Sequence, residues 1–244
     1  GCTAQTQPGL VALGGQAFAF DCERRYLEMH VESALGGPAH ALRDHAQAIC
    51  REMGAPSPEA LPPSVLPGLL EALRNKARQF GALPESAIEQ VHAAVQAVFA
   101  SWNNRRAIQY RKAHGISESL GTAVTIQAMV FGNVGDRSAT GVAFTRHPNS
   151  GERRLFGEYL SSAQGEDVVS GRFTPHPLCD ADGPGVSLQT QWPEAFAQLQ
   201  RIGVQLEGAL RDAQDIEFTI ENGTVWMLQT RPAERAARAA TRMA

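Results

Sequence analysis

The sequence predicts an α+β protein in which an all-helical subdomain precedes a lobe built on an antiparallel sheet. Apolar residues recur at steps of three and four before residue 114, the period of a helix, and at steps of two after it, the period of a strand. Two alternating segments, 215–220 and 224–231, flank an Asn-Gly pair and predict a β-hairpin. We therefore expect a helical subdomain over 1–113, a sheet lobe over 114–231, and a C-terminal helix or linker over 232–244.

The composition is that of an ordinary globular protein. Of the 244 residues, 43% are hydrophobic and 19% are charged, which excludes a disordered chain. The formal net charge of −3 provides no global basic field, so we expect neither nucleic acid nor a membrane as a partner. No apolar run approaches the roughly 18 residues of a membrane-spanning helix, and no charged start precedes one, as a secretory signal requires.

The cysteines and histidines show no metal or redox spacing. None of the four cysteines lies in a Cys-x-x-Cys motif, and we expect ordinary core or surface residues in a reducing, cytoplasmic protein; they are Cys2, Cys22, Cys50 and Cys179. The seven histidines form no ligand set. The chain begins with glycine rather than methionine, and we expect it to be a piece of something longer.

Three helices are expected in the first half. The clearest covers 86–102, where Ser86 and Glu89 form a capping box ahead of an apolar stripe. Earlier helices are indicated around 18–30 and 66–73 by apolar residues at helical spacing. The proline-rich stretch 55–67 is interpreted as a loop.

The second half is expected to contain strands, one loop and one helix. Alternation predicts a strand over 124–131, and shorter strands are expected over 142–145 and 155–160. Residues 174–191 hold three prolines and are interpreted as a surface loop, and apolar spacing over 196–210 predicts a helix.

The hairpin near the end carries the residues of greatest chemical interest. In its first strand Asp215 and Glu217 alternate with apolar residues, so both carboxylates lie on one face. A two-residue turn would direct Gln229 and Arg231 of the return strand to the opposite face. The position of the turn therefore decides whether the four polar groups meet.

We predict a three-residue turn over 221–223, with glycine in the left-handed position. This register pairs Asp215 with Gln229 and Glu217 with Met227, and it brings Arg231 to the same face. Two carboxylates and an amide oxygen suit Mg²⁺ together with substrate phosphates, and an adjacent arginine can bind a phosphate bidentately. The alternative is an ordinary hairpin whose acidic face simply meets water.

Several runs of residues carry a resemblance to a known family. They are 101–111, 121–124, 127–133, 140–146, 157–160, 163–171, 214–219 and 227–231. In this order they resemble the nucleotide-binding part of the pyruvate phosphate dikinase family, closely over 98–175 and 212–244 and more loosely over 13–97. The Ala-Gln-Gly-Glu-Asp run over 163–167 resembles the dikinase rather than phosphoenolpyruvate synthase, which is kept as an alternative.

The resemblance implies an ATP-grasp-like lobe that binds Mg²⁺ and ATP. The family converts ATP, phosphate and pyruvate to AMP, diphosphate and phosphoenolpyruvate, and a histidine on a separate domain carries the phosphoryl group. Catalysis of this kind is mostly positioning and charge neutralisation.

The family's site residues are carried over by matching its motifs to this sequence. The resemblance implies that Gln127 and the backbone of Ala128, Met129 and Val130 contact the adenine at a strand edge, and that Glu166 and Asp167 on the 163–171 run contact the ribose. It implies that Glu217 and Gln229 on the hairpin are Mg²⁺ ligands. It also implies that Asp215 and Arg231 beside them are catalytic groups, with Arg231 contacting the phosphates.

The resemblance also implies parts that this sequence does not contain. The family's first lobe, with its phosphate-binding lysine, would precede Gly1, and the phosphohistidine and pyruvate-binding domains would follow Ala244. We therefore expect ATP and those domains as partners, with a homodimer possible, and an isolated chain that is inactive. Thr125 stands where the family can have lysine. A non-catalytic interaction module that retains the fold is the second alternative.

Two further patterns allow alternatives. Arg231, Arg235, Arg238 and Arg242 follow at steps of four, three and four, which predicts one stripe on a tail helix. Such a stripe is either a solvated face or a docking surface for a downstream domain. Trp102 and Trp226 are interpreted as packing anchors.

Overall fold

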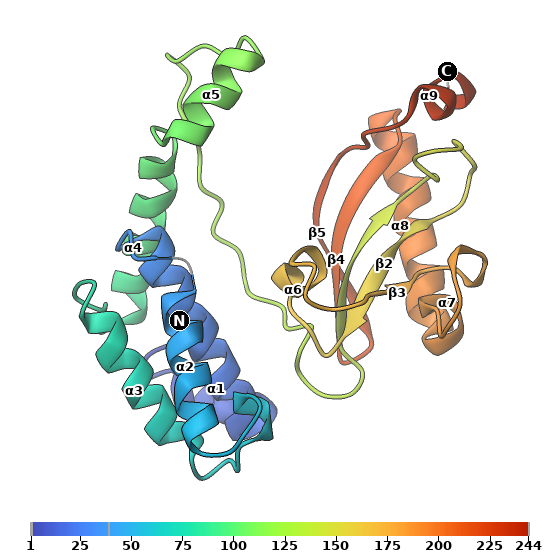
Figure 1. Ribbon diagram of the computed structural model, residues 1–244. Helices are drawn as coiled ribbons and strands as arrows, with labels where there is room; N and C mark the ends of the chain where they lie inside the picture. The colour runs from blue at the N-terminus through green and yellow to red at the C-terminus, as the bar shows by residue number, and fades with distance from the viewer. Residues whose placement is uncertain (1, 39, 244) are drawn as a thin grey trace. The chain divides into compact units, whose positions relative to one another are not determined.

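The computed structural model describes residues 2–38 and 40–243, with side chains described through Thr241 (Figure 1). The chain divides into two compact units, Gly1–Gln127 and Ala128–Ala244. The first unit contains helices and the second contains the sheet, so the predicted α+β class is confirmed. None of the helices in the described part of the chain is long and apolar enough to cross a membrane.

The first unit is built from helices joined by short turns. They are α1 (Gln7–Ser33), α2 (Ala41–Glu52), the 3₁₀ helix η1 (Pro58–Ala60), α3 (Leu66–Arg78), α4 (Ala87–Ser101) and α5 (Arg105–Ala113). Helix α1 contains a kink at Gly15, whose φ of 83° interrupts the helical backbone. Helices α1, α3 and α4 confirm the three predicted helices, whereas α2 and α5 were not predicted.

The core of the first unit lies among α1, α2 and α3. Leu27, Leu42 and Leu73, one from each helix, are buried together in it. This burial explains why the leucine spacing over 66–73 is a reliable helix signal, because the leucines share the face of α3 that meets its neighbours.

Helix α4 forms as predicted, but its apolar stripe is not a core face. Ser86 accepts a hydrogen bond from the Glu89 amide, and the Glu89 carboxylate accepts one from the Ser86 amide, so the capping box is confirmed. Ile88 and Phe99 on the stripe are nevertheless 60% and 49% exposed. Local spacing therefore predicted the helix correctly but not which face is buried.

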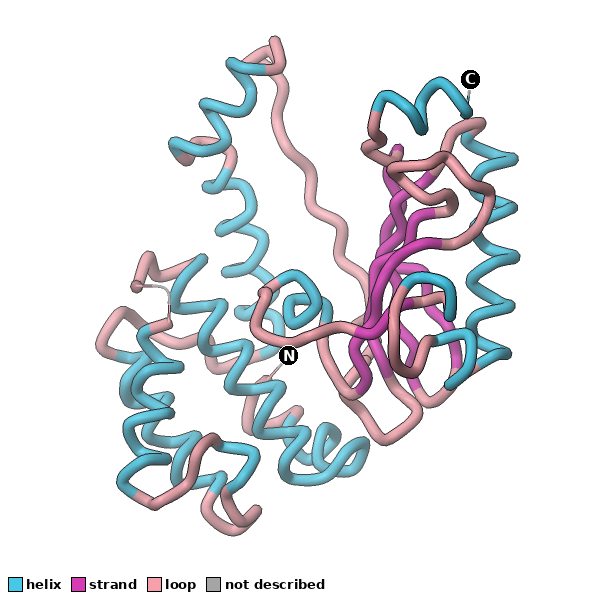
Figure 2. Tube along the Cα trace, turned by 45° about the vertical axis from the view of Figure 1, so that its right-hand side comes forward, coloured by secondary structure: helices cyan, strands magenta, loops and turns pink. Residues whose placement is uncertain are grey.

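The second unit is a five-stranded antiparallel sheet with one long helix against it (Figure 2). The strands are β1 (Ala139–Phe144), β2 (Phe156–Ser161), β3 (His176–Pro177), β4 (Gln214–Glu221) and β5 (Thr224–Pro232), in the order β3-β2-β1-β4-β5. Helices α6 (Gly165–Val169), α7 (Leu188–Gln191) and α8 (Pro193–Leu210), with the 3₁₀ helix η2 (Asp180–Asp182), lie between β2 and β4 in sequence. The strands predicted around 142–145, 155–160, 215–220 and 224–231 are confirmed.

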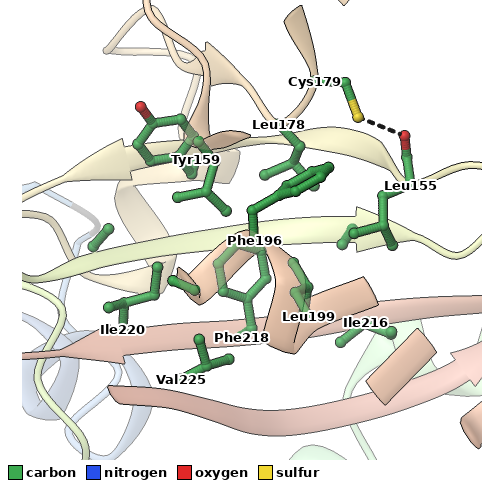
Figure 3. Close-up of a cluster of buried hydrophobic side chains, with 14 residues drawn as sticks. Leu155, Tyr159, Leu178, Cys179, Phe196, Leu199, Ile216, Phe218, Ile220 and Val225 are labelled. Carbon is green, nitrogen blue, oxygen red and sulfur yellow. Dashed lines mark hydrogen bonds between the residues drawn. The ribbon is translucent and has the colours of Figure 1, made fainter. Parts of the chain in front are cut away.

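Helix α8 covers one face of this sheet. Phe196 and Leu199 of α8 pack on Ile216, Phe218 and neighbouring side chains of the strands (Figure 3). Gly141 of β1 makes room for this packing, because a Cβ there would lie 2.6 Å from Phe218 Cζ. The α8 side of the sheet is therefore the core, and the opposite side carries the alternate residues of each strand.

The segment 124–131 is not the predicted strand. No strand of the described sheet pairs with it (Figure 1). Residues Gln127 to Met129 are exposed. Alternation of apolar and polar residues indicates a strand only where a neighbouring strand provides hydrogen bonds, and this part of the chain has none.

Two other expectations are corrected. Residues 174–191 contain β3, η2 and α7, and Leu178 and Leu188 within this stretch are fully buried, so it is not simply a surface loop. Trp226 is 48% exposed and is not a packing anchor, whereas Trp102 stacks under the Arg111 guanidinium with 4.0 Å between Cζ and the ring centroid.

The predicted arginine stripe does not form on one helix. Helix α9 (Ala237–Met243) begins after Arg231, which is in β5, and after Arg235, which is paired with Asp212. The side chain of Arg242 lies outside the described residues. The proline at 232 and the strand pairing of Arg231 separate the first two arginines from the helix.

Candidate functional site

The β4–β5 hairpin turns on two residues, Asn222 and Gly223. Both have positive φ, 49° and 84°, and Glu221 pairs with Thr224. The three-residue turn that we predicted is therefore wrong, as are the pairs of Asp215 with Gln229 and of Glu217 with Met227. An Asn-Gly pair favours the two-residue turn because both residues tolerate positive φ, and this preference outweighs the alternative that we chose.

A β-bulge brings Gln229 and Arg231 to the same face as the two acids, which the two-residue turn by itself would prevent. From the turn up to Phe218 the pairing is regular, and a regular continuation would place Leu228 opposite Glu217. The register instead shifts by one residue between Glu217 and Phe218, with Leu228 as the extra residue of β5. As a result Gln229 pairs with Glu217, and Arg231 pairs with Asp215.

The four polar groups therefore lie on one face of the hairpin, in two cross-strand residue pairs, or rungs. These are neighbours on this face, and the Ile216–Thr230 pair between them belongs to the other face. The face with the four polar groups is the sheet face opposite α8, because Ile216 and Phe218 alternate with Asp215 and Glu217 and point into the α8 core. The shared face was expected from the sequence, but the bulge and not the turn produces it.

The Asp215–Arg231 rung is closed by a hydrogen-bonded ion pair. Arg231 Nε donates to Asp215 Oδ2 at 2.8 Å. The Asp215 side chain is 11% exposed and that of Arg231 is 62% exposed, so the carboxylate is held in the sheet and the guanidinium extends from it. Hydrogen bonding and charge from Asp215, with a smaller effect of Glu217, raise the pKa of Arg231 above its ordinary value.

The terminal nitrogens of Arg231 make no hydrogen bond to any described residue. Because Nε donates a hydrogen bond to Asp215, the orientation of the planar guanidinium is fixed relative to the sheet. A guanidinium fixed in this way can bind a phosphate with two parallel hydrogen bonds.

The Glu217–Gln229 rung offers oxygen atoms that are not otherwise engaged. Neither side chain makes a hydrogen bond within the described part of the chain; Glu217 is half-buried and Gln229 is exposed. Opposed side chains on paired strands have Cβ atoms about 5 Å apart, so both oxygens can reach one cation. A carboxylate and an amide oxygen beside a second carboxylate are donors that fit Mg²⁺, which takes few protein ligands and completes its shell with water and phosphate.

Among residues 2–38 and 40–243, the hairpin included, no group of three or more histidine, cysteine, aspartate or glutamate side chains could hold a metal ion. The Glu217–Gln229 rung does not form such a group by itself, because one of its ligands is an amide. A Mg²⁺ site formed by one carboxylate and one amide therefore needs phosphate oxygens of the substrate as further ligands.

Three residues that sequence reasoning missed border the four groups. Val142 lies beside Glu217 in β1, Phe144 lies beside Asp215, and Glu158 of β2 lies opposite Val142 on the same face. The Phe144 ring is 6.4 Å from that of Phe156, centroid to centroid. Alternation within the strands around 142–145 and 155–160 could have predicted that these residues share one face. It could not have predicted which strand lies next to β4.

Glu166 and Asp167 belong to the short helix α6, on the same side of the sheet. Val168 of α6 packs against Leu160 and Val142, which lie on the face opposite α8. Asp167 is buried and accepts a hydrogen bond from the Gln164 amide at 3.0 Å, so its carboxylate caps the helix. Glu166 is exposed. Of the two, Glu166 has the more accessible carboxylate.

The residues expected at the adenine do not form a strand edge. Gln127 closes the first compact unit, and Ala128, Met129 and Val130 open the second as an irregular segment. This segment is anchored just beyond Val130, where the Phe131 amide donates to Glu221 Oε1 at 2.9 Å. The backbone of Ala128 to Val130 is therefore attached next to the hairpin turn without joining the sheet.

The chain matches the family described as pyruvate phosphate dikinase, AMP/ATP-binding domain, over residues 78–179 and 178–244. A pyruvate, phosphate dikinase of Rickettsia conorii is 44% identical over 236 residues, which cover 95% of this chain and 26% of that protein. The dikinases of Rhizobium meliloti and Clostridium symbiosum are 42% and 40% identical over 240 and 234 residues, again covering 95% of this chain and 26% of each relative.

The chain thus spans about a quarter of the length of these curated relatives. The family match covers both the hairpin and α6, and the relatives align with nearly the whole chain. This chain belongs to the pyruvate phosphate dikinase AMP/ATP-binding domain family.

Proposed function

We propose that this chain forms one side of a Mg²⁺–ATP site that serves phosphoryl transfer in a pyruvate phosphate dikinase. The observation that carries the proposal is the two residue pairs on the sheet face opposite α8, Asp215 with Arg231 and Glu217 with Gln229. One rung suits an anion and the next suits a cation, which is the combination that a metal-bound polyphosphate presents.

Each residue of the two rungs has a separate part. Arg231 binds phosphate oxygens through its terminal nitrogens, and Asp215 holds the guanidinium in position through Nε. Glu217 and Gln229 hold Mg²⁺, with Asp215 beside them. When bound, the metal ion neutralises charge on the phosphate oxygens during transfer.

The nucleoside is assigned to the segments that border this face. The backbone of Ala128, Met129 and Val130, with Gln127 before them, is proposed for the adenine, which needs only exposed N–H and C=O groups and not a strand. Glu166 and Asp167 are proposed for the ribose. Because Asp167 caps α6, we assign the hydroxyl contact to Glu166 and the placement of α6 to Asp167.

The complete reaction belongs to a longer protein. We propose the dikinase reaction, from ATP, phosphate and pyruvate to AMP, diphosphate and phosphoenolpyruvate, in a cytoplasmic enzyme with phosphohistidine and pyruvate-binding domains and a possible dimer. The dikinase names of the relatives favour this reaction over that of phosphoenolpyruvate synthase. The isolated chain is expected to be inactive, because it spans only about a quarter of the length of the dikinases that it matches.

Calorimetric titration with Mg²⁺–ATP tests the proposal on this chain and on a longer version that includes the preceding lobe. We expect tighter binding by the longer version, and a loss of about tenfold or more in Glu217→Gln. Glu194→Gln, an exposed acid at the start of α8, is the matched control and should bind like the wild type. Failure of the longer version to bind Mg²⁺–ATP would contradict the enzyme interpretation and favour a non-catalytic module.

A further inference from the structure

A polar cavity lies on the α8 side of the second unit, on the other side of the sheet from Asp215, Glu217, Gln229 and Arg231. It has a volume of about 590 Å³ and opens between the end of β1, the β1–β2 turn and the C-terminal half of α8. Thr145 and Leu155 line it from the sheet side, and Gly203 and Glu207 line it from α8. This volume is within the range of sites that hold small molecules.

The cavity is lined by more cations than anions. Four arginines line it, against two acids; they are Arg146, Arg153, Arg154 and Arg211, with Glu207 and Asp212. Both acids already form ion pairs with arginine side chains. Arg146 binds both oxygens of Glu207, at 2.9 Å from Nε and 3.0 Å from Nη2, and Asp212 pairs with Arg235.

Arg154 is more than neutralised by two carboxylates, whereas two of the other arginines have no acidic partner. Arg154 pairs with Asp182 at 2.7 Å and with Glu152 at 3.1 Å. The side chains of Arg153 and Arg211 make no hydrogen bond or ion pair with any described residue, and both are exposed. Arg153 is near enough to the Arg146–Glu207 pair for its charge to act on the Glu207 carboxyl.

The surrounding structure does not cancel this positive charge. The cavity includes the C-terminal end of α8, whose carbonyl groups carry the equivalent of about −0.5 charge. The two unpaired guanidinium groups exceed that value together with the one negative charge by which Glu152 and Asp182 outweigh Arg154. Gly208 also lines the cavity and contributes open space, because a Cβ at this position would meet nothing within 4 Å.

We propose that this cavity binds a small phosphate-bearing anion, with Arg153 and Arg211 as its two cationic ligands and the Arg146–Glu207 pair as its floor. Guanidinium groups match the oxygens of a phosphate or diphosphate in charge and in planar hydrogen-bond geometry. The site is separate from the proposed nucleotide site, because its residues lie on the α8 side of the sheet and those of the hairpin rungs lie on the other.

Titration with inorganic diphosphate, without metal and at constant ionic strength, tests the proposal on the 244-residue chain. In ¹H–¹⁵N spectra we expect the amides of Gly208 and Arg211 to shift, with a Kd of about 1 mM or tighter. Shifts confined to the hairpin around Gln229 and Arg231, or weaker binding than this, would overturn the proposal. Constant ionic strength is needed because salt screens exposed charges.

Substitutions then identify the ligands. Arg153→Gln with Arg211→Gln should weaken diphosphate binding by about tenfold or more, since each charge-assisted hydrogen bond contributes strongly. Arg201→Gln is the matched control, because Arg201 is exposed on α8 and does not line the cavity. An equal loss in the control would mean non-specific attraction and would refute the site. The wild-type shift map decides the question even if the double variant unfolds.

Discussion

Arg231 Nε lies 2.8 Å from Asp215 Oδ2, and these two residues pair across neighbouring strands only because β5 contains a bulge. The hydrogen bond that orients the Arg231 guanidinium therefore depends on the register shift between β4 and β5. The carboxylate is buried and the guanidinium is exposed, so the pair directs an arginine outward rather than contributing to the core.

Asp215→Asn should weaken Mg²⁺–ATP binding with little effect on stability. The pair is largely exposed on the arginine side, so its loss should change the free energy of unfolding by less than about 1 kcal/mol. Without the charge of Asp215 the guanidinium is less well oriented, and we expect about tenfold weaker binding. Calorimetry and urea unfolding on the longer version check the two values, and a large stability loss with unchanged affinity would contradict the positioning role.

Two single-residue deletions test the bulge. Deleting Leu228 removes the extra residue and leaves Gln229 opposite Glu217 and Arg231 opposite Asp215, so Mg²⁺–ATP binding should be retained. Deleting Thr230 places Arg231 opposite Ile216, on the α8 face, and binding should be lost. Calorimetry on both folded variants checks this, and equal behaviour of the two deletions would show that the shared face does not matter.

Glu207 should make the stability of the second unit sensitive to acid. Burial raises the pKa of this carboxyl, but hydrogen bonds from Arg146 and Thr145 and the charge of Arg146 outweigh burial, so the pKa lies below its ordinary value of 4.5. A depressed pKa in the folded state means that the stabilisation is complete above pH 4.5 and is lost as the pH falls through the lower folded value.

Glu207→Gln should therefore reduce the free energy of unfolding by about 1–3 kcal/mol at neutral pH, and by progressively less in acid. Urea unfolding as a function of pH measures this difference, with Glu194→Gln as the control that should show none. A difference that does not shrink below pH 4.5 would show that the carboxylate charge is not its cause.

Leu199→Ala and Val204→Ala compare the two faces of α8. Leu199 is fully buried against the sheet, and its truncation should cost about 2–5 kcal/mol. Val204 is 72% exposed, and its truncation should change stability by about 0.5 kcal/mol or less. Thermal or urea unfolding gives both values. Similar costs at the two positions would mean that the face of α8 shown in Figure 3 is not the buried one.

The predictions from sequence succeeded where the signal is local. The capping box at Ser86 and Glu89 begins α4, because both hydrogen bonds join residues three apart. The alternation over 215–220 predicted β4 and placed Asp215 and Glu217 on one face, because side-chain direction along a strand depends only on the strand itself. The same reasoning failed for 124–131, where strand structure required a partner.

The sequence alone thus determined that the segments around 18–30, 66–73, 86–102 and 196–210 are helical, and which acids share a face with each other. Only the tertiary structure decided that Gln229 and Arg231 join those acids, because the bulge at Leu228 is a property of two strands packed together and has no signature in either one. Likewise, only packing decided that Ile88 and Phe99 remain exposed while Leu199 is buried. Periodicity shows that a helix has an apolar face, and the neighbouring elements determine whether that face is covered.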